Sequence, residues 1–258
     1  MANPALSNNP AFKKGSTVTA AQLEELYERP AASPADTGRM TYEDTAVKTV
    51  ILFAVLLVTS AVGWFVPALA IVGAIAGFVL AMVNTFKREP SVPLIVLYAA
   101  AEGLFVGGIS RFFENVYSGI VVQAVLATLV TVGVTLALFA SGKIRASAKA
   151  TKIFLIAMVS YLVFALLNVV LSLTGVVNEP FGLYSAKIGG IPLGLVIGVL
   201  VVIMAAYSLV LDFDQIQQGV RRGIPARYGW TGAFGIMVTV VWLYVEILRI
   251  IAIARGNN

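Results

Sequence analysis

The chain has 258 residues, of which 59% are hydrophobic and only 12% are charged. A water-soluble domain carries about 25% charged residues, so the composition argues against a soluble fold. The chain contains no cysteine and no histidine, which removes disulfides, thiolate nucleophiles, Ser-His-Asp catalysis and the usual imidazole metal site. No aromatic-interleaved basic patch accompanies the net charge of +5, so nucleic acid is not expected as a partner.

The first 45 residues are polar and carry Asn, Ser, Pro and charges of both signs. We expect residues 1–45 to form a largely disordered cytoplasmic tail. A short helix within this tail is the alternative, because Thr19 and Gln22 have the spacing of a capping box and Pro30 would end the helix. The tail lacks the basic region and short apolar core of a cleavable signal peptide.

Long uncharged runs follow the tail and predict membrane-spanning helices, since about 20 apolar residues are needed to cross the hydrocarbon of a bilayer. The run from Thr49 to Phe86 is too long for one span, and Pro67 divides it into two. Charged segments separate the later runs. We therefore predict an all-α integral membrane protein, a bundle of seven transmembrane helices within residues 46–255. The spans are expected at 49–65, 68–86, 93–110, 119–140, 153–174, 190–212 and 232–254.

The distribution of basic residues predicts the orientation of this bundle. Fourteen of the 18 Lys and Arg residues fall in the tail and in every second connection. Cytoplasmic segments are enriched in Lys and Arg, so the N-terminus is expected in the cytoplasm and the C-terminus outside.

Glycines spaced four residues apart recur in the predicted spans and are typical of close helix packing. They occur in three sets: Gly73 and Gly77; Gly103 and Gly107; Gly190, Gly194 and Gly198.

Four ionisable residues are predicted at membrane depth, where each costs about 2.5–3.5 kcal/mol or more unless it is paired or lines a wet cavity. They are Glu102, Asp212, Glu246 and Arg249. Glu246 and Arg249 are spaced i and i+3, so they share a helix face and can pair. Asp214 lies about 200° around the helix from Asp212 and is interpreted as a solvated interface residue.

Two kinds of role are open for these residues. A purely structural one is possible, in which the Glu246–Arg249 pair fixes helix packing and Glu102 hydrogen-bonds a neighbouring helix. In a functional one, carboxylates suit calcium binding or proton exchange. Without histidine, any sensitivity to pH near neutrality must come from such buried carboxylates. The residues alone do not separate a pH-gated cation path from a proton-coupled transporter.

Membrane enzymes are the competing class. A rhomboid-type protease needs a serine in a G-x-S-x-G-like context with a histidine base, and the nearest segment, Gly108 to Phe112, ends differently. The paired G-x-G-D type of motif of a membrane aspartyl protease is absent. We therefore predict no enzymatic activity and no cofactor.

Four segments of the chain resemble a known family. YSLVLDFDQI at residues 207–216 is similar to the sixth-helix motif of the Bax inhibitor-1 (TMBIM) family, and LYVEILR at residues 243–249 is similar to its seventh-helix segment. RMTYED at residues 39–44, leading to Lys48 and Thr49, and QAVLAT at residues 123–128 resemble the actinobacterial branch. The resemblance covers roughly residues 39–255 and depends on motif order and helix count together.

This resemblance implies a function. Bacterial relatives are seven-helix, pH-sensitive calcium leak channels in which two acidic residues on the last two helices pair and regulate the pore. Here Asp212 and Glu246 would be that pair, with calcium and protons as ligands and calcium as the transported ion. A basic residue after the second helix, Arg88 or Lys87, would latch the first acid. The bacterial inner membrane would be the location, with the lipid bilayer as partner; the resemblance names no protein partner.

Two departures from the family pattern concern the pair. Glu246 stands where relatives often have Asp, and 34 positions separate it from Asp212. Asp212 would lie about 33 Å along its helix from Gly190, whereas Glu246 would lie about 12 Å from the outer end of its own. This mismatch in depth shrinks if Gly229, Gly232 and Gly235 mark an interfacial turn, so that helix seven proper begins near residue 236. Helix six would then continue through Gln218 and stop at Gly219. A proton-coupled transporter of a small molecule and a regulatory scaffold acting through its tail remain alternatives.

Overall fold

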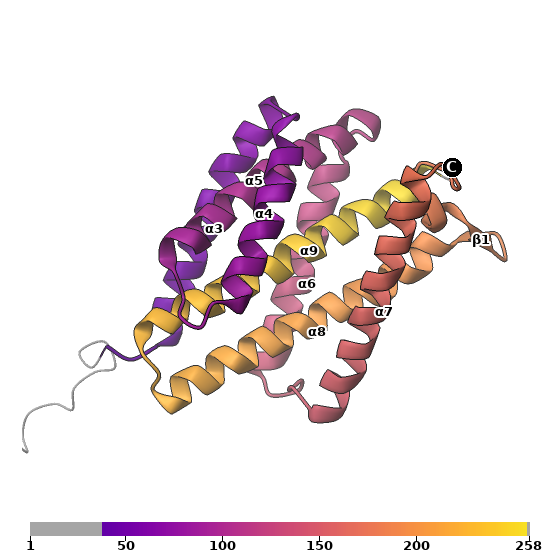
Figure 1. The fold of residues 1–258 in the computed structure, drawn as a ribbon. Helices are drawn as coiled ribbons and strands as arrows, with labels where there is room; N and C mark the ends of the chain where they lie inside the picture. Colours follow the sequence, from indigo (N-terminus) through magenta and orange to yellow (C-terminus); the bar gives the residue numbers. More distant parts are fainter. Residues whose placement is uncertain (1–37, 257–258) are drawn as a thin grey trace, which may run out of the picture. The chain divides into compact units, whose positions relative to one another are not determined.

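The computed structural model describes residues 38–256. Most of the predicted tail, including its possible short helix, lies outside these residues. Within them, seven helices are long and apolar enough to span a membrane, as predicted. They are α3 (Tyr42–Phe65), α4 (Leu69–Phe86), α5 (Val92–Val116), α6 (Ile120–Ala140), α7 (Ala148–Leu173), α8 (Leu193–Arg222) and α9 (Gly229–Gly256) (Figure 1).

Several helices extend beyond their predicted ends. α3 begins seven residues early because Thr41 caps it: the Thr41 hydroxyl accepts a hydrogen bond from the Asp44 amide at 3.0 Å. α5 continues through Arg111 to Val116. α8 passes Gly219 and ends at Gly223, which adopts a φ of 62°. Charged residues at a membrane surface therefore do not end these helices, and boundaries placed at charges are too short.

The prediction that Gly190 belongs to a helix is wrong. Gly189 and Gly190 have φ values of 59° and 85° and connect two short antiparallel strands, β1 (Lys187–Ile188) and β2 (Ile191–Pro192). A two-residue hairpin of this kind needs positive φ at both central positions, which glycine adopts without strain. The helical part of that glycine series is Gly194 and Gly198 alone.

α9 is the central helix of residues 38–256. It packs against α3, α5, α6 and α8, while α4 packs on α5 (Figure 1). The predicted close packing is confirmed at Gly103 and Gly107 of α5, where an added Cβ would collide with Thr59 and with the Ser60 carbonyl of α3. Most of the apolar stretch of α9 is consequently shielded from lipid.

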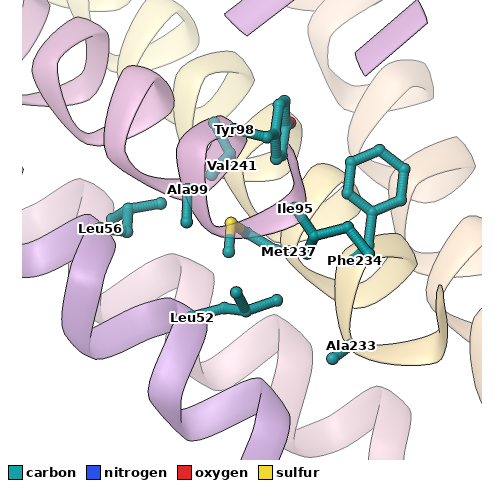
Figure 2. Close-up of a cluster of buried hydrophobic side chains, with 9 residues drawn as sticks. All are labelled: Leu52, Leu56, Ile95, Tyr98, Ala99, Ala233, Phe234, Met237 and Val241. Carbon is teal, nitrogen blue, oxygen red and sulfur yellow. The ribbon is translucent and has the colours of Figure 1, made fainter. Parts of the chain in front are cut away.

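Two clusters of buried apolar side chains hold the helices on α9. The first joins α3, α5 and α9 (Figure 2), and the Tyr98 ring meets Phe234 edge-on at a centroid distance of 4.9 Å. Its members are Leu52, Leu56, Ile95, Tyr98, Ala99, Ala233, Phe234, Met237 and Val241. The second joins α6, α8 and α9 and includes Leu209, Leu243 and Leu248. Because α9 contributes to both clusters, it fixes the position of the acidic residues it carries.

α7 differs from the other helices because none of its described residues is buried. Polar contacts join it to the rest of the bundle near both ends. The Tyr207 hydroxyl of α8 lies 3.0 Å from the Thr151 hydroxyl, and the Asn168 side chain accepts a 2.6 Å hydrogen bond from the Leu183 amide. Leu183 belongs to η2 (Gly182–Ser185), a short helix in the loop before α8. The apolar surface of α7 is thus left for lipid.

The connections gather at two ends of the bundle, which we call the basic end and the loop end. The basic end comprises residues 38–48, 87–91, 141–147 and 221–228. The segment before α3 is pinned there, since the Met40 amide donates to the Ile224 carbonyl at 2.8 Å and Lys48 donates to the Ala226 carbonyl at 2.7 Å. The loop end comprises residues 66–68, 117–119, 174–192 and the C-terminal turn of α9.

Candidate functional site

Glu246 lies at the centre of a buried polar cluster between α7 and α9. It is only 4% exposed. The Tyr161 hydroxyl of α7 donates to its Oε1, and Arg249 donates to its Oε2. Arg249 also donates to the Tyr161 hydroxyl at 3.1 Å. The predicted i, i+3 pairing of Glu246 with Arg249 is therefore confirmed, and a third member from α7 completes the cluster.

The aromatic ring of Tyr184 covers the other side of Arg249. The guanidinium carbon of Arg249 lies 4.1 Å from the centroid of this ring, which η2 supplies. A cation over an aromatic face is stabilised by the ring's quadrupole, most strongly where water is excluded. Arg249 is thus held by a carboxylate and by tyrosines from two other elements. Removing one partner of such a buried pair costs about 3–5 kcal/mol.

Asp212 is held separately, on α8. Its Oδ2 accepts a 2.7 Å hydrogen bond from the Thr239 hydroxyl of α9, and Thr239 also lies 3.2 Å from the Ser208 hydroxyl. Gly235 gives the carboxylate room, because an added Cβ there would lie 2.9 Å from the Asp212 Oδ1. Among residues 38–256 no Lys or Arg forms an ion pair with Asp212. Within the described residues, the partner of this carboxylate is thus a neutral hydroxyl and not a cation.

The structure gives Asp212 and Glu246 separate hydrogen-bonding partners, and no hydrogen bond joins the two carboxylates within residues 38–256. Thr239, the partner of Asp212, precedes Glu246 by seven residues, or about 10 Å along α9. α8 does continue past Gln218, to Arg222, but α9 begins at Gly229, so residues 229–235 are helical and do not form the interfacial turn that would have reduced the mismatch in depth. Seven residues are nearly two full turns, so Thr239 and Glu246 lie on the same face of α9. Asp212 of α8 reaches this face through Thr239.

The calcium site expected at Asp212 and Glu246 stays a prediction. In the described part of the chain, no group of three or more acidic side chains could hold a metal ion.

The two candidate latch residues, Lys87 and Arg88, lie at the basic end. They line a cavity of about 280 Å³ together with Gln215 of α8 and Gly235 of α9. The cavity therefore reaches the glycine that faces Asp212, but neither basic side chain forms an ion pair with that carboxylate. The adjacent Glu89 makes the ion pair of this loop, with both carboxylate oxygens 3.2 Å from Arg227.

Two further acids lie away from both carboxylate sites. Glu102 on α5 faces α4, where an added Cβ at Gly77 would lie 2.8 Å from its Oε1, and its hydrogen-bonding neighbour is Tyr98 one turn earlier. Asp214 accepts a 2.6 Å hydrogen bond from Gln218 on an exposed surface, which agrees with its prediction as a solvated residue.

Sequence reasoning missed three members of the site: Tyr161, Tyr184 and Thr239. Each is a hydroxyl-bearing residue that apolar packing alone does not require. Tyr161 stands in the middle of the predicted span 153–174, which has no charged residue, and Thr239 precedes Glu246 by two turns on the same helix face. These signals exist in the sequence, but only the fold shows which carboxylate each hydroxyl reaches.

A scan against families of known proteins decides the relationship of this chain. The family described as Bax inhibitor 1 like matches residues 3–256. The chain belongs to this family. No curated protein matches it.

Family membership agrees with the fold, a multi-pass membrane bundle of seven apolar helices. Within this Bax inhibitor 1-like protein, the segments that carried the resemblance now have positions. Residues 207–216 contain Asp212 beside α9, and residues 243–249 contain the Glu246–Arg249 pair. The match supports the family and not a particular activity, so function has to be argued from these two sites.

Proposed function

We propose that this protein is a pH-sensitive leak pathway for calcium or similar cations, and that the path follows α9 past Asp212 and Glu246. The pathway lies where α7 and α8 face α9. Asp212 is the acid that the cation passes, and Glu246 is the pH-sensitive group that holds the path closed; the two do not form a directly bonded pair.

The observation that carries this proposal is a pair of cavities at opposite ends of one face of α9. The cavity at the basic end reaches Gly235, beside Asp212. A second cavity of about 300 Å³ at the loop end reaches Arg249, beside Glu246. About 21 Å of α9 separates Gly235 from Arg249, which is roughly two thirds of the hydrocarbon thickness of a bilayer. The part of the bundle between the two cavities contains both carboxylates, and we call it the plug. A closed segment between two cavities is the arrangement expected of a closed conduction path.

The cluster around Glu246 supplies a reason for pH sensitivity. When Glu246 is charged, it attracts Arg249 and accepts from Tyr161, which holds α7 against α9. Protonation removes the charge that both partners contact. Because α7 has no buried residue among those described, few apolar contacts oppose its release. Lower pH should therefore loosen α7 and open the plug.

The basic residues in both cavities favour a slow leak over rapid conduction. Lys87 and Arg88 line one cavity and Arg249 lines the other, so a divalent cation meets repulsion at each end. Asp212 supplies the negative charge that offsets this repulsion, because the charge of Glu246 is already matched by Arg249. Since cytoplasmic segments are enriched in Lys and Arg, we place the basic end in the cytoplasm and, by the family resemblance, the protein in a bacterial inner membrane.

Calcium flux into proteoliposomes carrying Asp212→Asn tests the assignment. Asn keeps an oxygen for the Thr239 hydroxyl but removes the negative charge, so calcium flux should fall several-fold at every pH, while the pH dependence set by Glu246 remains. Asp214→Asn is the matched control, because the Asp214 carboxylate accepts its hydrogen bond from Gln218 on the exposed surface, and it should behave as wild type. Unchanged flux in Asp212→Asn would show that the path does not pass this carboxylate.

The two cavities also suit a second function, proton-coupled transport of a small molecule. Each cavity has about the volume of a small-ligand site, and a plug between them is compatible with alternating access. The two functions differ in proton stoichiometry. A transporter moves protons only when its substrate is present, whereas the leak pathway conducts calcium with no added solute.

A further inference from the structure

The cavity at the loop end has a composition suited to a ligand. It lies between α7, η2 and α9, with Asn168 and Ser172 on one side and Tyr184 and Arg249 on another. Its remaining described lining residues are small or apolar, and none is Asp or Glu. The cavity thus combines one cation, several neutral polar groups and an apolar surface.

Two hydrogen-bond donors of this lining have no acceptor among residues 38–256. They are the Nε of Arg249 and the hydroxyl of Tyr184, and both atoms are buried. Tyr184 is only 4% exposed, and its ring lies under the Arg249 guanidinium. Buried polar groups in native proteins are nearly always hydrogen-bonded, so two neighbouring orphan donors mark a place for a group that accepts hydrogen bonds.

Charge determines which acceptor fits. The groups that act electrostatically on Arg249 are Glu246 on its own helix, Tyr161 on α7 and Tyr184 on η2. α6 contains no charged residue, and the acid of α8 that faces α9 is Asp212, whose partner Thr239 lies ten residues, or about 15 Å, before Arg249. In the loop before η2, Glu179 precedes the lining residue Pro180. Glu246 uses the Nη2 edge of Arg249, and the Nε edge remains for a second acceptor.

We infer that the loop-end cavity binds a small organic anion with one carboxylate or sulfonate group. The anion accepts hydrogen bonds from Arg249 Nε and from the Tyr184 hydroxyl. Its apolar part packs against Ala165, Val169 and Phe181, which line the same cavity. Arg249 thereby becomes shared between the ligand and Glu246.

Sharing one cation has a consequence for protonation. A single buried arginine cannot neutralise two carboxylate-like groups, because like charges close together in a poorly hydrated site repel strongly. Binding of the anion therefore favours protonation of Glu246, and affinity rises as pH falls. The effect on flux rests on the proposed function: the anion should weaken the hold of Glu246 on α7 and raise calcium leak.

Calorimetric titration of the full chain in nanodiscs with 1-propanesulfonate tests the site, since this probe stays anionic at every pH used. We expect a dissociation constant in roughly the millimolar range that tightens by up to about tenfold per pH unit, the limit for one linked proton. Neutral 1-propanesulfonamide is the matched ligand and should not bind. Absence of binding, or equal binding of both compounds, would overturn the inference.

Two variants locate the site. Tyr184→Phe keeps the ring beneath Arg249 and removes the hydroxyl, so it should weaken binding about tenfold, while Tyr207→Phe at the basic end should leave it unchanged. Glu246→Gln frees Arg249 and should bind more tightly with no pH dependence. Wild-type affinity in both Tyr184→Phe and Glu246→Gln would place the probe elsewhere. Binding is measured without flux, so a protein that binds the sulfonate but leaks no calcium refutes the proposed function and leaves the site standing.

Discussion

Replacing Tyr161 by Phe removes the one hydroxyl that joins α7 to the Glu246–Arg249 pair. The ring can stay in place, where it lies 6.4 Å from the Trp242 ring. Two hydrogen bonds are lost, one donated to Glu246 and one accepted from Arg249. Hydrogen bonds between membrane helices contribute about 0.6 kcal/mol on average and up to about 1.7, and those to charged groups about 1.5–3.

We therefore expect Tyr161→Phe to destabilise docking of α7 by about 1.5–3 kcal/mol. A change of 1.4 kcal/mol shifts a two-state equilibrium about tenfold, so the open population at neutral pH should rise about tenfold or more while it is still small. Calcium entry into proteoliposomes at neutral pH should increase by the same factor.

Tyr244→Phe is the control for this experiment. The Tyr244 hydroxyl is also buried and hydrogen-bonded, to Ser110 at 2.6 Å, but it joins α9 to α5 and not to α7. Its loss should lower stability without raising the leak. If Tyr161→Phe and Tyr244→Phe both fold, and Tyr161→Phe shows the same calcium flux as wild type, the Glu246 cluster does not hold the path closed.

Three other substitutions give further expected outcomes. Glu246→Gln should reproduce the protonated state, so its calcium flux at neutral pH should match that of wild type in acid and vary little with pH; a retained pH profile would assign the sensor to another group. Gly235→Ala places a Cβ 2.9 Å from the Asp212 carboxylate and should lower stability by about 1–3 kcal/mol in thermal unfolding, whereas Gly133→Ala meets no neighbour within 4 Å and should be neutral or stabilising. Glu114→Ala removes the carboxylate that accepts from the Gly119 and Val121 amides at the start of α6 and should cost about 0.5–2 kcal/mol, as for loss of a helix cap; an unchanged melting temperature would contradict that role.

The number of helices and the order of the spans could be predicted from sequence because bilayer thickness sets the length of an apolar run. The ends of the helices could not. α5 and α8 continue past charged residues, since a helix satisfies its own backbone on both sides of the membrane surface. The four-residue spacing of Gly190 from Gly194 is typical of helix packing and predicted a helix there. Gly189 and Gly190 instead adopt the positive φ values of a hairpin turn.

In the candidate site, too, some contacts could be predicted from sequence and others could not. The i, i+3 spacing of Glu246 and Arg249 is local, so their pairing could be predicted. The relation of Asp212 to Glu246 depends on how α8 and α9 are staggered, and no local pattern encodes that stagger. The hydroxyl partners Tyr161 and Thr239 come from other elements for the same reason. Motif resemblance identified the acids correctly as residues of two distinct helices, and their separation by about two turns of α9 follows only from the fold.

The most direct test of the central claim is the pH dependence of calcium entry into liposomes that contain the purified wild-type protein. Calcium entry should exceed that of protein-free liposomes, require no other solute, and increase as pH falls through the range in which Glu246 takes up its proton. Entry indistinguishable from protein-free liposomes at every pH, in a preparation shown to be folded, would contradict the account.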